Sequence, residues 1–202
     1  RGSLMASDKQ IAAFFDVDHT LVAKWSMEKL FILFLLRKRY FQISDLTRYF
    51  ARRVRARLAG QITDGNKYHF KNKNSHELDR LAAECFRSAI KTRVSRKGLR
   101  IVENHRRMGH LIILVTGSLM PLALEMQREI AADMVIAATL AQKDGLLLGT
   151  LANQLPYGPE KARLVRELAK DHGIDLTRSF AYGNHHSDID RKSTRLNSSH
   201  YS

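Results

Sequence analysis

Two carboxylates and a hydroxyl group follow a short apolar stretch near the start of the chain. Residues Ile11–Val22 read IAAFFDVDHTLV, so Asp16, Asp18 and Thr20 come directly after the apolar residues. An apolar run of this length, rich in Phe and Val, predicts a buried parallel strand. Alternate side chains share a side, so we expect Asp16 and Asp18 to face the same way at its carboxyl end, where open α/β sheets bind ligands. Two like charges this close predict a hard cation, most simply Mg²⁺; the alternative is a pair of solvated acids that cap a helix.

Two more groups stand where predicted strands and helices meet. The segment Leu111–Ser118, LIILVTGS, ends in Thr116 followed by Gly117. A hydroxyl and a backbone N–H at a strand end can hold a phosphate oxygen, although an ordinary strand-to-helix turn with a capping hydroxyl is the alternative. Lys161 begins a predicted helix, where a cation opposes the helix dipole. Its position indicates pairing with a carboxylate or a phosphate, and a solvated surface lysine is the alternative.

A fourth group follows the predicted strand Phe180–Tyr182. Asn184 and Asp188 lie in the sequence GNHHSD, on a loop that can return to the first pair of carboxylates. The adjacent His185 and His186 also raise the idea of zinc. We disfavour zinc, because neighbouring histidines rarely bind one ion and no Cys or second His pair accompanies them.

The elements that must position these groups alternate between strand and helix after a long helical stretch. The helical pattern covers about Ser26–Met108. Within it, Asn74 with Glu77 resembles a capping box that opens a helix through roughly Thr92, and another helix is predicted over Lys97–Met108. Beyond it we predict strands, helices and a hairpin turn as follows: a strand over Leu111–Val115, a helix over Met120–Ala132, a strand over Met134–Leu140, a turn at residues 143–145, a helix over Glu160–His172 capped by Gly173, and a strand over Phe180–Tyr182.

This order predicts an α/β fold with a Rossmann-like parallel sheet core and a helical cap inserted after the first strand. We assign residues 1–22 and 109–189 to the core and residues 23–108 to the cap. Residues Asp190–His200, DRKSTRLNSSH, have no apolar periodicity and resemble the translation of a sequencing-library adapter. We therefore expect residues 190–202 to be an artefactual tail, the native sequence to continue differently beyond about Asp188, and the last strand to lack a further neighbour. A genuine disordered basic tail is the alternative.

Composition limits the partners and the compartment. Lys and Arg number 34 against 20 Asp and Glu, a formal net charge of +14. This balance favours anionic partners, namely phosphorylated small molecules or lipid headgroups; nucleic acid is unlikely because no nucleic-acid module accompanies the charge. The single cysteine, Cys85, excludes an internal disulfide and fits a reducing compartment, and we expect it to be a buried helix residue. No signal peptide or bilayer-spanning run is visible, so we expect a cytoplasmic protein.

Taken in order, the four groups resemble the motifs of the haloacid dehalogenase superfamily of phosphohydrolases. The matching patterns are DxDxT at residues 16–20, a hydrophobic residue with Thr-Gly at 115–117, Lys161, and GNxxxD at 183–188. The helical insert resembles the first type of cap in that superfamily, as in relatives of phosphoserine phosphatase. Residues 109–118 and 144–188 are most similar to the bacterial subgroup IB.

The resemblance implies an Mg²⁺-dependent phosphatase that hydrolyses a phosphomonoester through an aspartyl-phosphate. It implies that Asp16 is the nucleophile and that Asp18 is the general acid and then the general base. It also implies that Thr116 and the Gly117 backbone hold the phosphoryl oxygens, while Lys161 neutralises charge on the nucleophile and the phosphate.

The same resemblance implies a metal site and reveals one departure from the family pattern. Mg²⁺ would sit on Asp16, the Asp18 carbonyl and Asn184, with Asp188 supporting it directly or through water. The family usually carries Asp where this chain has Asn184, and an amide oxygen can bind Mg²⁺ but brings no negative charge. A catalytically impaired protein that binds phosphate ligands is therefore an alternative.

Two features of the insert bear on the substrate. Trp25 stands where phosphoserine phosphatases carry a Glu that recognises the substrate ammonium group, although Glu28 is nearby, so phosphoserine is disfavoured. The apolar run Leu30–Leu36 is followed by three basic residues, 37–39, which is typical of an interfacial helix. A membrane-associated phosphatase of lipid phosphates, with peripheral membrane contact, is thus a second alternative. We favour instead a packed cap helix with a solvated basic end.

Overall fold

A parallel sheet forms the centre of the molecule. The computed structural model describes residues 9–22, 25–42, 44–45, 47, 51, 54, 67–183 and 197–199. The strands lie in the order β3-β2-β1-β6-β7 and are all paired in parallel. Their bounds are β1 Ala12–Phe15, β2 Leu111–Leu119, β3 Met134–Ala138, β6 Phe180–Tyr182 and β7 Asn197–Ser199. The predicted α/β class is confirmed, and the chain order reverses at β1, which makes its carboxyl end the topological switch point.

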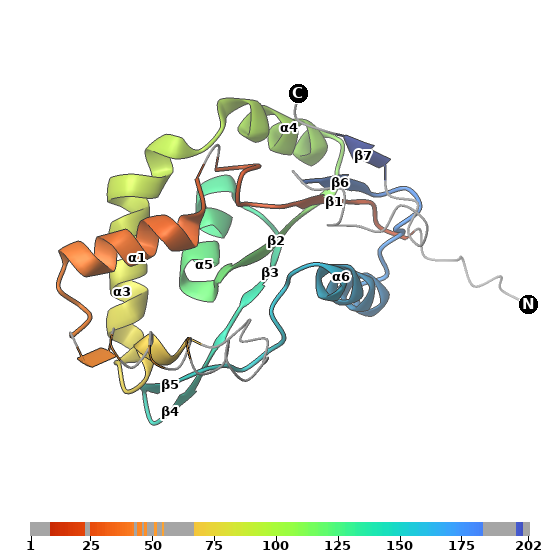
Figure 1. Cartoon of the computed structure of the whole chain (residues 1–202). Helices are drawn as coiled ribbons and strands as arrows, with labels where there is room; N and C mark the ends of the chain where they lie inside the picture. Colours follow the sequence, from red (N-terminus) through yellow and green to blue (C-terminus); the bar gives the residue numbers. More distant parts are fainter. Residues whose placement is uncertain are drawn as a thin grey trace, which may run out of the picture.

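Helices cover both faces of this sheet, because successive strand residues point to opposite faces. On one face, Phe15 belongs to a large apolar cluster with residues of α1 (Met27–Arg37), α3 (Ser75–Cys85) and α5 (Met120–Ile130). On the other face, Phe14 packs with residues of α6 (Pro159–Asp171). Figure 1 shows α5 and α6 on opposite sides of the strands. Within the described part of the chain, none of the helices combines the length and apolar character needed to cross a membrane.

The two ends of the insert between β1 and β2 lie side by side. Val22 and Val94 form an antiparallel bridge, and the Ser95 N–H donates to the Leu21 carbonyl over 2.8 Å. The helix α4 (Arg96–Arg107) then packs on β2, although the sequence assigns it to the cap. The domain boundaries themselves stay a prediction.

The Asn74 half of the predicted capping box is present at the start of α3, where Asn74 Oδ1 accepts from the Glu77 N–H over 3.0 Å. The sequence predicts that this helix runs to about residue 92, but the regular α-helix ends at Cys85. After Cys85, which is fully buried, it widens into a π-helical turn, Phe86–Ile90, and ends in a 3₁₀ turn, Lys91–Arg93.

The predicted hairpin is formed by β4 (Leu140–Lys143) and β5 (Leu146–Leu151). Both turn residues, Asp144 and Gly145, have positive φ, which is the conformation that tight hairpin turns need. The strand predicted over Met134–Leu140 is present from Met134 but ends earlier than predicted, because the chain leaves the sheet at Ala138 and enters the hairpin at Leu140.

The β4–β5 hairpin also pairs with residues 67–75 of the insert. The Lys67 N–H donates to the Gly149 carbonyl over 3.0 Å, and the Leu147 N–H donates to the Lys73 carbonyl over 2.9 Å. Gly149 has φ +77°, and a Cβ atom there would lie 3.1 Å from Tyr68 Cα. Only glycine fits this close approach without strain.

The expectation that the last predicted strand, Phe180–Tyr182, lacks a further neighbour is wrong. Residues 197–199 form β7, which pairs in parallel with β6 through the main chain. The physical reason is that an edge strand presents unpaired N–H and C=O groups, which an extended segment can match without any apolar side chain. That residues 190–202 are artefactual stays a prediction.

Candidate active site

Asp16 and Lys161 meet at the switch point of the sheet. Asp16 continues the alternation of Ala12 and Phe14, which face α6, and Lys161 lies in the first turn of that helix. Lys161 Nζ lies 2.9 Å from Asp16 Oδ1, with the side chains only 8% and 15% exposed. The predicted pairing of Lys161 with an anionic group is therefore confirmed.

The main chain of Asp16 is fixed by the neighbouring strand. Its N–H donates to the carbonyl of Tyr182, the last residue of β6, over 2.8 Å. Its Oδ1 also accepts from the Val17 N–H over 2.9 Å. Asp16 is thus fixed by β6 through its main chain, while its carboxylate is held by Lys161 of α6 and by the Val17 N–H.

Asp18 connects the end of β2 with the first helix of the insert. Its Oδ1 accepts from the Met27 N–H over 2.7 Å, and its Oδ2 accepts from Ser118 Oγ over 2.8 Å and from Thr116 Oγ1 over 3.4 Å. Met27 begins α1, so the carboxylate caps this helix, as the alternative interpretation of the sequence holds. Strand alternation does not set the direction of Asp18, because β1 already ends at Phe15.

Thr116 and Ser118 are fully buried hydroxyl residues inside β2. Thr116 Oγ1 also accepts from the Ser118 N–H over 3.1 Å. Neither hydroxyl caps α5, whose N-cap is Leu119 without a side-chain capping bond, so the alternative of an ordinary capped turn is not supported. Gly117 lies beside the loop before α6, since a Cβ atom there would be 3.6 Å from the Pro156 carbonyl.

Ser118 is the functional contact that sequence reasoning missed. The residue belongs to the second motif, but nothing in its spacing shows that its hydroxyl reaches Asp18, 100 residues away. The sequence gives only a weak indication of this contact. Ser118 lies two residues after Thr116 in the same strand, so the two side chains face the same side of the sheet.

The predicted metal site is only partly within the described structure. Asn184, His185, His186 and Asp188 lie outside the described residues. Among those that are described, no group of three His, Cys, Asp or Glu side chains could hold a metal ion. The Asp16 carboxylate and the main chain of Asp18 nevertheless offer oxygen donors at the strand end, which fit a hard cation such as Mg²⁺ in kind.

The insert contributes charged groups beside the start of α1. Glu28 forms an ion pair with Lys67, whose side chain is 14% exposed. Trp25 is 46% exposed, and the Arg93 guanidinium lies 5.7 Å from the centre of its ring. The Glu28 carboxylate is therefore already bound to a cation.

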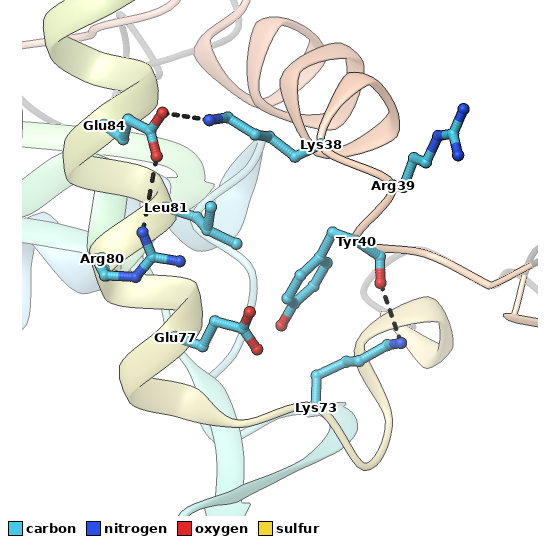
Figure 2. Close-up of a pocket in the computed structure, with 8 residues that line it drawn as sticks. All are labelled: Lys38, Arg39, Tyr40, Lys73, Glu77, Arg80, Leu81 and Glu84. Carbon is cyan, nitrogen blue, oxygen red and sulfur yellow. Dashed lines mark hydrogen bonds and ion pairs between the residues drawn. The ribbon is translucent and has the colours of Figure 1, made fainter.

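A separate cavity of about 300 Å³ lies between the end of α1 and α3 (Figure 2). Its lining charges mostly pair with one another, since Lys38 lies 2.5 Å and Arg80 3.8 Å from Glu84. Lys73 Nζ donates to the Tyr40 carbonyl over 3.2 Å. These contacts hold α1 against α3, and neither Asp16 nor Lys161 lines the cavity.

Comparison with known proteins places this geometry in a family. A profile of haloacid dehalogenase-like hydrolases matches residues 13–190. A phosphoserine phosphatase of Mycobacterium tuberculosis is 26% identical over 190 residues, which cover 90% of this chain and 61% of that protein. The chain spans 61–63% of the length of three mycobacterial relatives, of which this phosphatase is one.

Two solved structures show the same fold. A protein of unknown function from Bordetella pertussis superposes with a TM-score of 0.75 at 20% identity, covering 93% of this chain and 88% of that one. A substrate-bound phosphoserine phosphatase superposes with a TM-score of 0.60 at 16% identity, covering 95% of this chain and 86% of that one. At these identities the likeness concerns the fold alone.

Proposed function

This chain belongs to the haloacid dehalogenase-like hydrolase family, and on that premise we propose that it is an Mg²⁺-dependent phosphatase acting through an aspartyl-phosphate. One observation carries the proposal: the buried Asp16 carboxylate lies 2.9 Å from the Lys161 ammonium group at the switch point of the sheet. A carboxylate that is fixed in this way is suited to attack phosphorus, because its partner cation offsets the charge that it brings to an anionic ester.

The reaction follows from the neighbouring groups. An Asp16 oxygen attacks phosphorus while the bond to the ester oxygen breaks, and Asp18 gives its proton to that leaving oxygen. Asp18 then takes a proton from water, whose oxygen attacks phosphorus and releases phosphate from Asp16. Ser118 and the Met27 N–H keep the Asp18 carboxyl group in position during both steps. Thr116 and the Gly117 N–H bind the phosphoryl oxygens, and Lys161 balances their charge.

Bound Mg²⁺ would neutralise further negative charge of the phosphate. Asp16, the Asp18 carbonyl and Asn184 would hold the ion, and Asp188 would support it. Replacing Asn184 with Asp adds a charged ligand, so Mg²⁺ affinity rises if Asn184 contacts the ion. Titration calorimetry with Mg²⁺ that gives equal or weaker binding for Asn184→Asp would remove Asn184 from the site.

The decisive experiment is Asp16→Asn with an aryl phosphate as substrate. We expect hydrolysis to fall to a trace while circular dichroism shows an intact fold. Asp144→Asn, at the remote hairpin turn, is the matched control and keeps full activity. A phosphate label on Asp16, detected by mass spectrometry after rapid quenching, separates the aspartyl-phosphate route from direct attack by water. Retained turnover in Asp16→Asn would exclude Asp16 as the nucleophile.

The alternative of a phosphate-binding protein without turnover, motivated by Asn184, is separated by the same assay. An unaltered chain that binds phosphate but hydrolyses no aryl phosphate at any Mg²⁺ concentration would support that alternative.

For the substrate we propose a phosphorylated small molecule without an amino group close to the phosphate. The relative described above is named a phosphoserine phosphatase. Here, however, Lys67 already neutralises Glu28, so this carboxylate has little attraction left for a substrate ammonium group. We expect glycerol phosphate to be hydrolysed faster than phosphoserine, and Lys67→Met to narrow that difference. An unchanged ratio in Lys67→Met would mean that Glu28 does not face the substrate.

A lipid phosphate is the second candidate, and the outer side of α1 favours it. Leu33 is 50% and Leu36 is 41% exposed, next to the basic residues 37–39. The opposite side of α1 is packed as the favoured interpretation of the sequence, a packed cap helix, expects, since Phe31 and Leu35 are fully buried. Co-sedimentation with anionic vesicles at low salt, lost in Leu33→Ser/Leu36→Ser, would support membrane contact; no binding would exclude it.

A further inference from the structure

Three hydrogen-bonded side chains that the proposed reaction does not use, centred on the buried His105, connect α4 to the end of β6. His105, which is 3% exposed, contacts the Tyr182 hydroxyl through Nε2 over 2.7 Å. Through Nδ1 it contacts His110 Nδ1 over 2.8 Å. The Tyr182 ring stacks on Phe15 with 4.8 Å between ring centres and 12° between the planes.

The protonation states of the two histidines are constrained by these hydrogen bonds. Two imidazole nitrogens 2.8 Å apart share one hydrogen, so one ring donates and the other accepts. Burial, and then the neighbouring His110, lower the pKa of His105, while burial and the charge of Arg178 lower the pKa of His110. Both rings are therefore neutral near pH 7. A neutral His105 has one donor and one acceptor, and His110 and Tyr182 occupy one each.

Tyr182 connects these hydrogen-bonded side chains to Asp16 in the candidate active site. Its carbonyl accepts from the Asp16 N–H over 2.8 Å, and Asn184 follows two residues later. The strand that it ends, β6, has three residues, so its pairing with β1 offers few hydrogen bonds to fix that end. A side-chain anchor on Tyr182 adds what so short a strand lacks.

We propose that His105, oriented by His110, is a positioning residue that fixes Tyr182, and through Tyr182 fixes the backbone of Asp16 and the start of the segment that carries Asn184. The consequence for catalysis rests on the proposed function. The positioning of the Asp16 backbone does not, because it follows from hydrogen bonds alone.

Matched variants separate hydrogen bonding from ring packing. Tyr182→Phe removes only the hydroxyl and keeps the stacking on Phe15. His105→Gln places an amide near the former Nε2 and can still bond Tyr182. His105→Asn places its amide near the former Nδ1 and reaches His110 only. Tyr157→Phe removes a hydroxyl from a residue that is 74% exposed and serves as the control.

The first measurement is hydrogen exchange of the Asp16 amide by NMR without any metal. We expect roughly tenfold faster exchange in Tyr182→Phe and His105→Asn, the effect of losing about one hydrogen bond, with His105→Gln and Tyr157→Phe close to the unaltered protein. The second measurement is Mg²⁺ binding by calorimetry, which should weaken in the same two variants. Unchanged Asp16 exchange in Tyr182→Phe would overturn the proposal, as would equal acceleration in His105→Gln and His105→Asn. Faster exchange in a protein that hydrolyses no phosphate ester would support the positioning and count against the proposed function instead.

Discussion

Replacing Lys161 with Met tests the central ion pair of the site. The change keeps the apolar stem of the side chain and removes its charge. Because Lys161 Nζ lies 2.9 Å from Asp16 Oδ1 and both side chains are largely buried, the change removes a cation that is in direct contact with the Asp16 carboxylate. We expect both the free energy of unfolding and the rate of phosphate hydrolysis to fall.

The magnitude follows from the distance and the burial. At 2.9 Å the Coulomb attraction is roughly 6 kcal/mol for an effective dielectric constant of about 20. The desolvation of both ions offsets much of it, yet removing one partner of a buried pair typically costs about 3–5 kcal/mol. Asp16 keeps 15% exposure, so water screens part of the loss and we expect the lower end of that range. For kcat we expect a decrease of about 10²–10³, as for other groups that stabilise transition-state charge.

The assay is a double-mutant cycle of urea unfolding with Lys161→Met, Asp16→Asn and the variant that carries both changes. Asp16→Asn removes the charge that Lys161→Met leaves behind, so the double variant should regain about 2 kcal/mol relative to the sum of the single effects. Lys143→Met, at an exposed position of the hairpin, is the matched control and should stay within about 0.5 kcal/mol of the unaltered protein. Additive effects in the cycle would refute the reasoning, since they would mean that the two charges do not stabilise each other.

Three further expectations concern other contacts. Ser118→Ala removes the 2.8 Å hydrogen bond to Asp18 and should lower kcat about tenfold with little change in KM; a change in KM alone would mean that Ser118 binds substrate instead. Gly149→Ala should cost about 2 kcal/mol in urea unfolding because of its positive φ and its approach to Tyr68. Gly145→Ala shares the positive φ without a close neighbour and should cost less, so equal costs would exclude the contact as a cause. Burial, and then the charge of Lys67, lowers the pKa of His69 from its ordinary value of 6.5 to about 4. As the pH falls, this histidine is therefore protonated in the unfolded chain before it is protonated in the folded protein. Stability should therefore drop by about 2 kcal/mol between pH 7 and pH 5, and His69→Leu should show a clearly smaller drop.

The features that the sequence predicts well depend on neighbouring residues. The capping box at Asn74, the hairpin turn at Asp144 and the approach of Lys161 to an anionic group each follow from a few consecutive residues and their preferred geometry. The strand that ends just before Asp16 and the strand that contains Thr116 follow from apolar runs of strand length.

The features that it does not predict depend on contacts between distant segments. The pairing of residues 67–75 with β5 uses main-chain groups, which leave no pattern of side chains to recognise. The π-helical turn after Cys85 has ordinary helical composition, so nothing in its residue types distinguishes it from an α-helix. The contact of His105 with Tyr182 joins residues 77 positions apart, and a lone histidine on a helix gives no indication of its partner.

The meeting of the two ends of the insert, at the Val22–Val94 bridge, has a consequence for the evolution of substrate selectivity. A segment that leaves and returns at one point can change in length with little change in loop-closure entropy, about 0.6 kcal/mol for each doubling. Residues 23–93 are therefore open to exchange for a segment of different ancestry, while Asp16, Thr116 and Lys161 all lie outside them. A grafted segment must meet three conditions: it must cover the apolar side chains of α5 that α3 now packs against, it must pair with β5, and it must offer a helix start for Asp18 to cap.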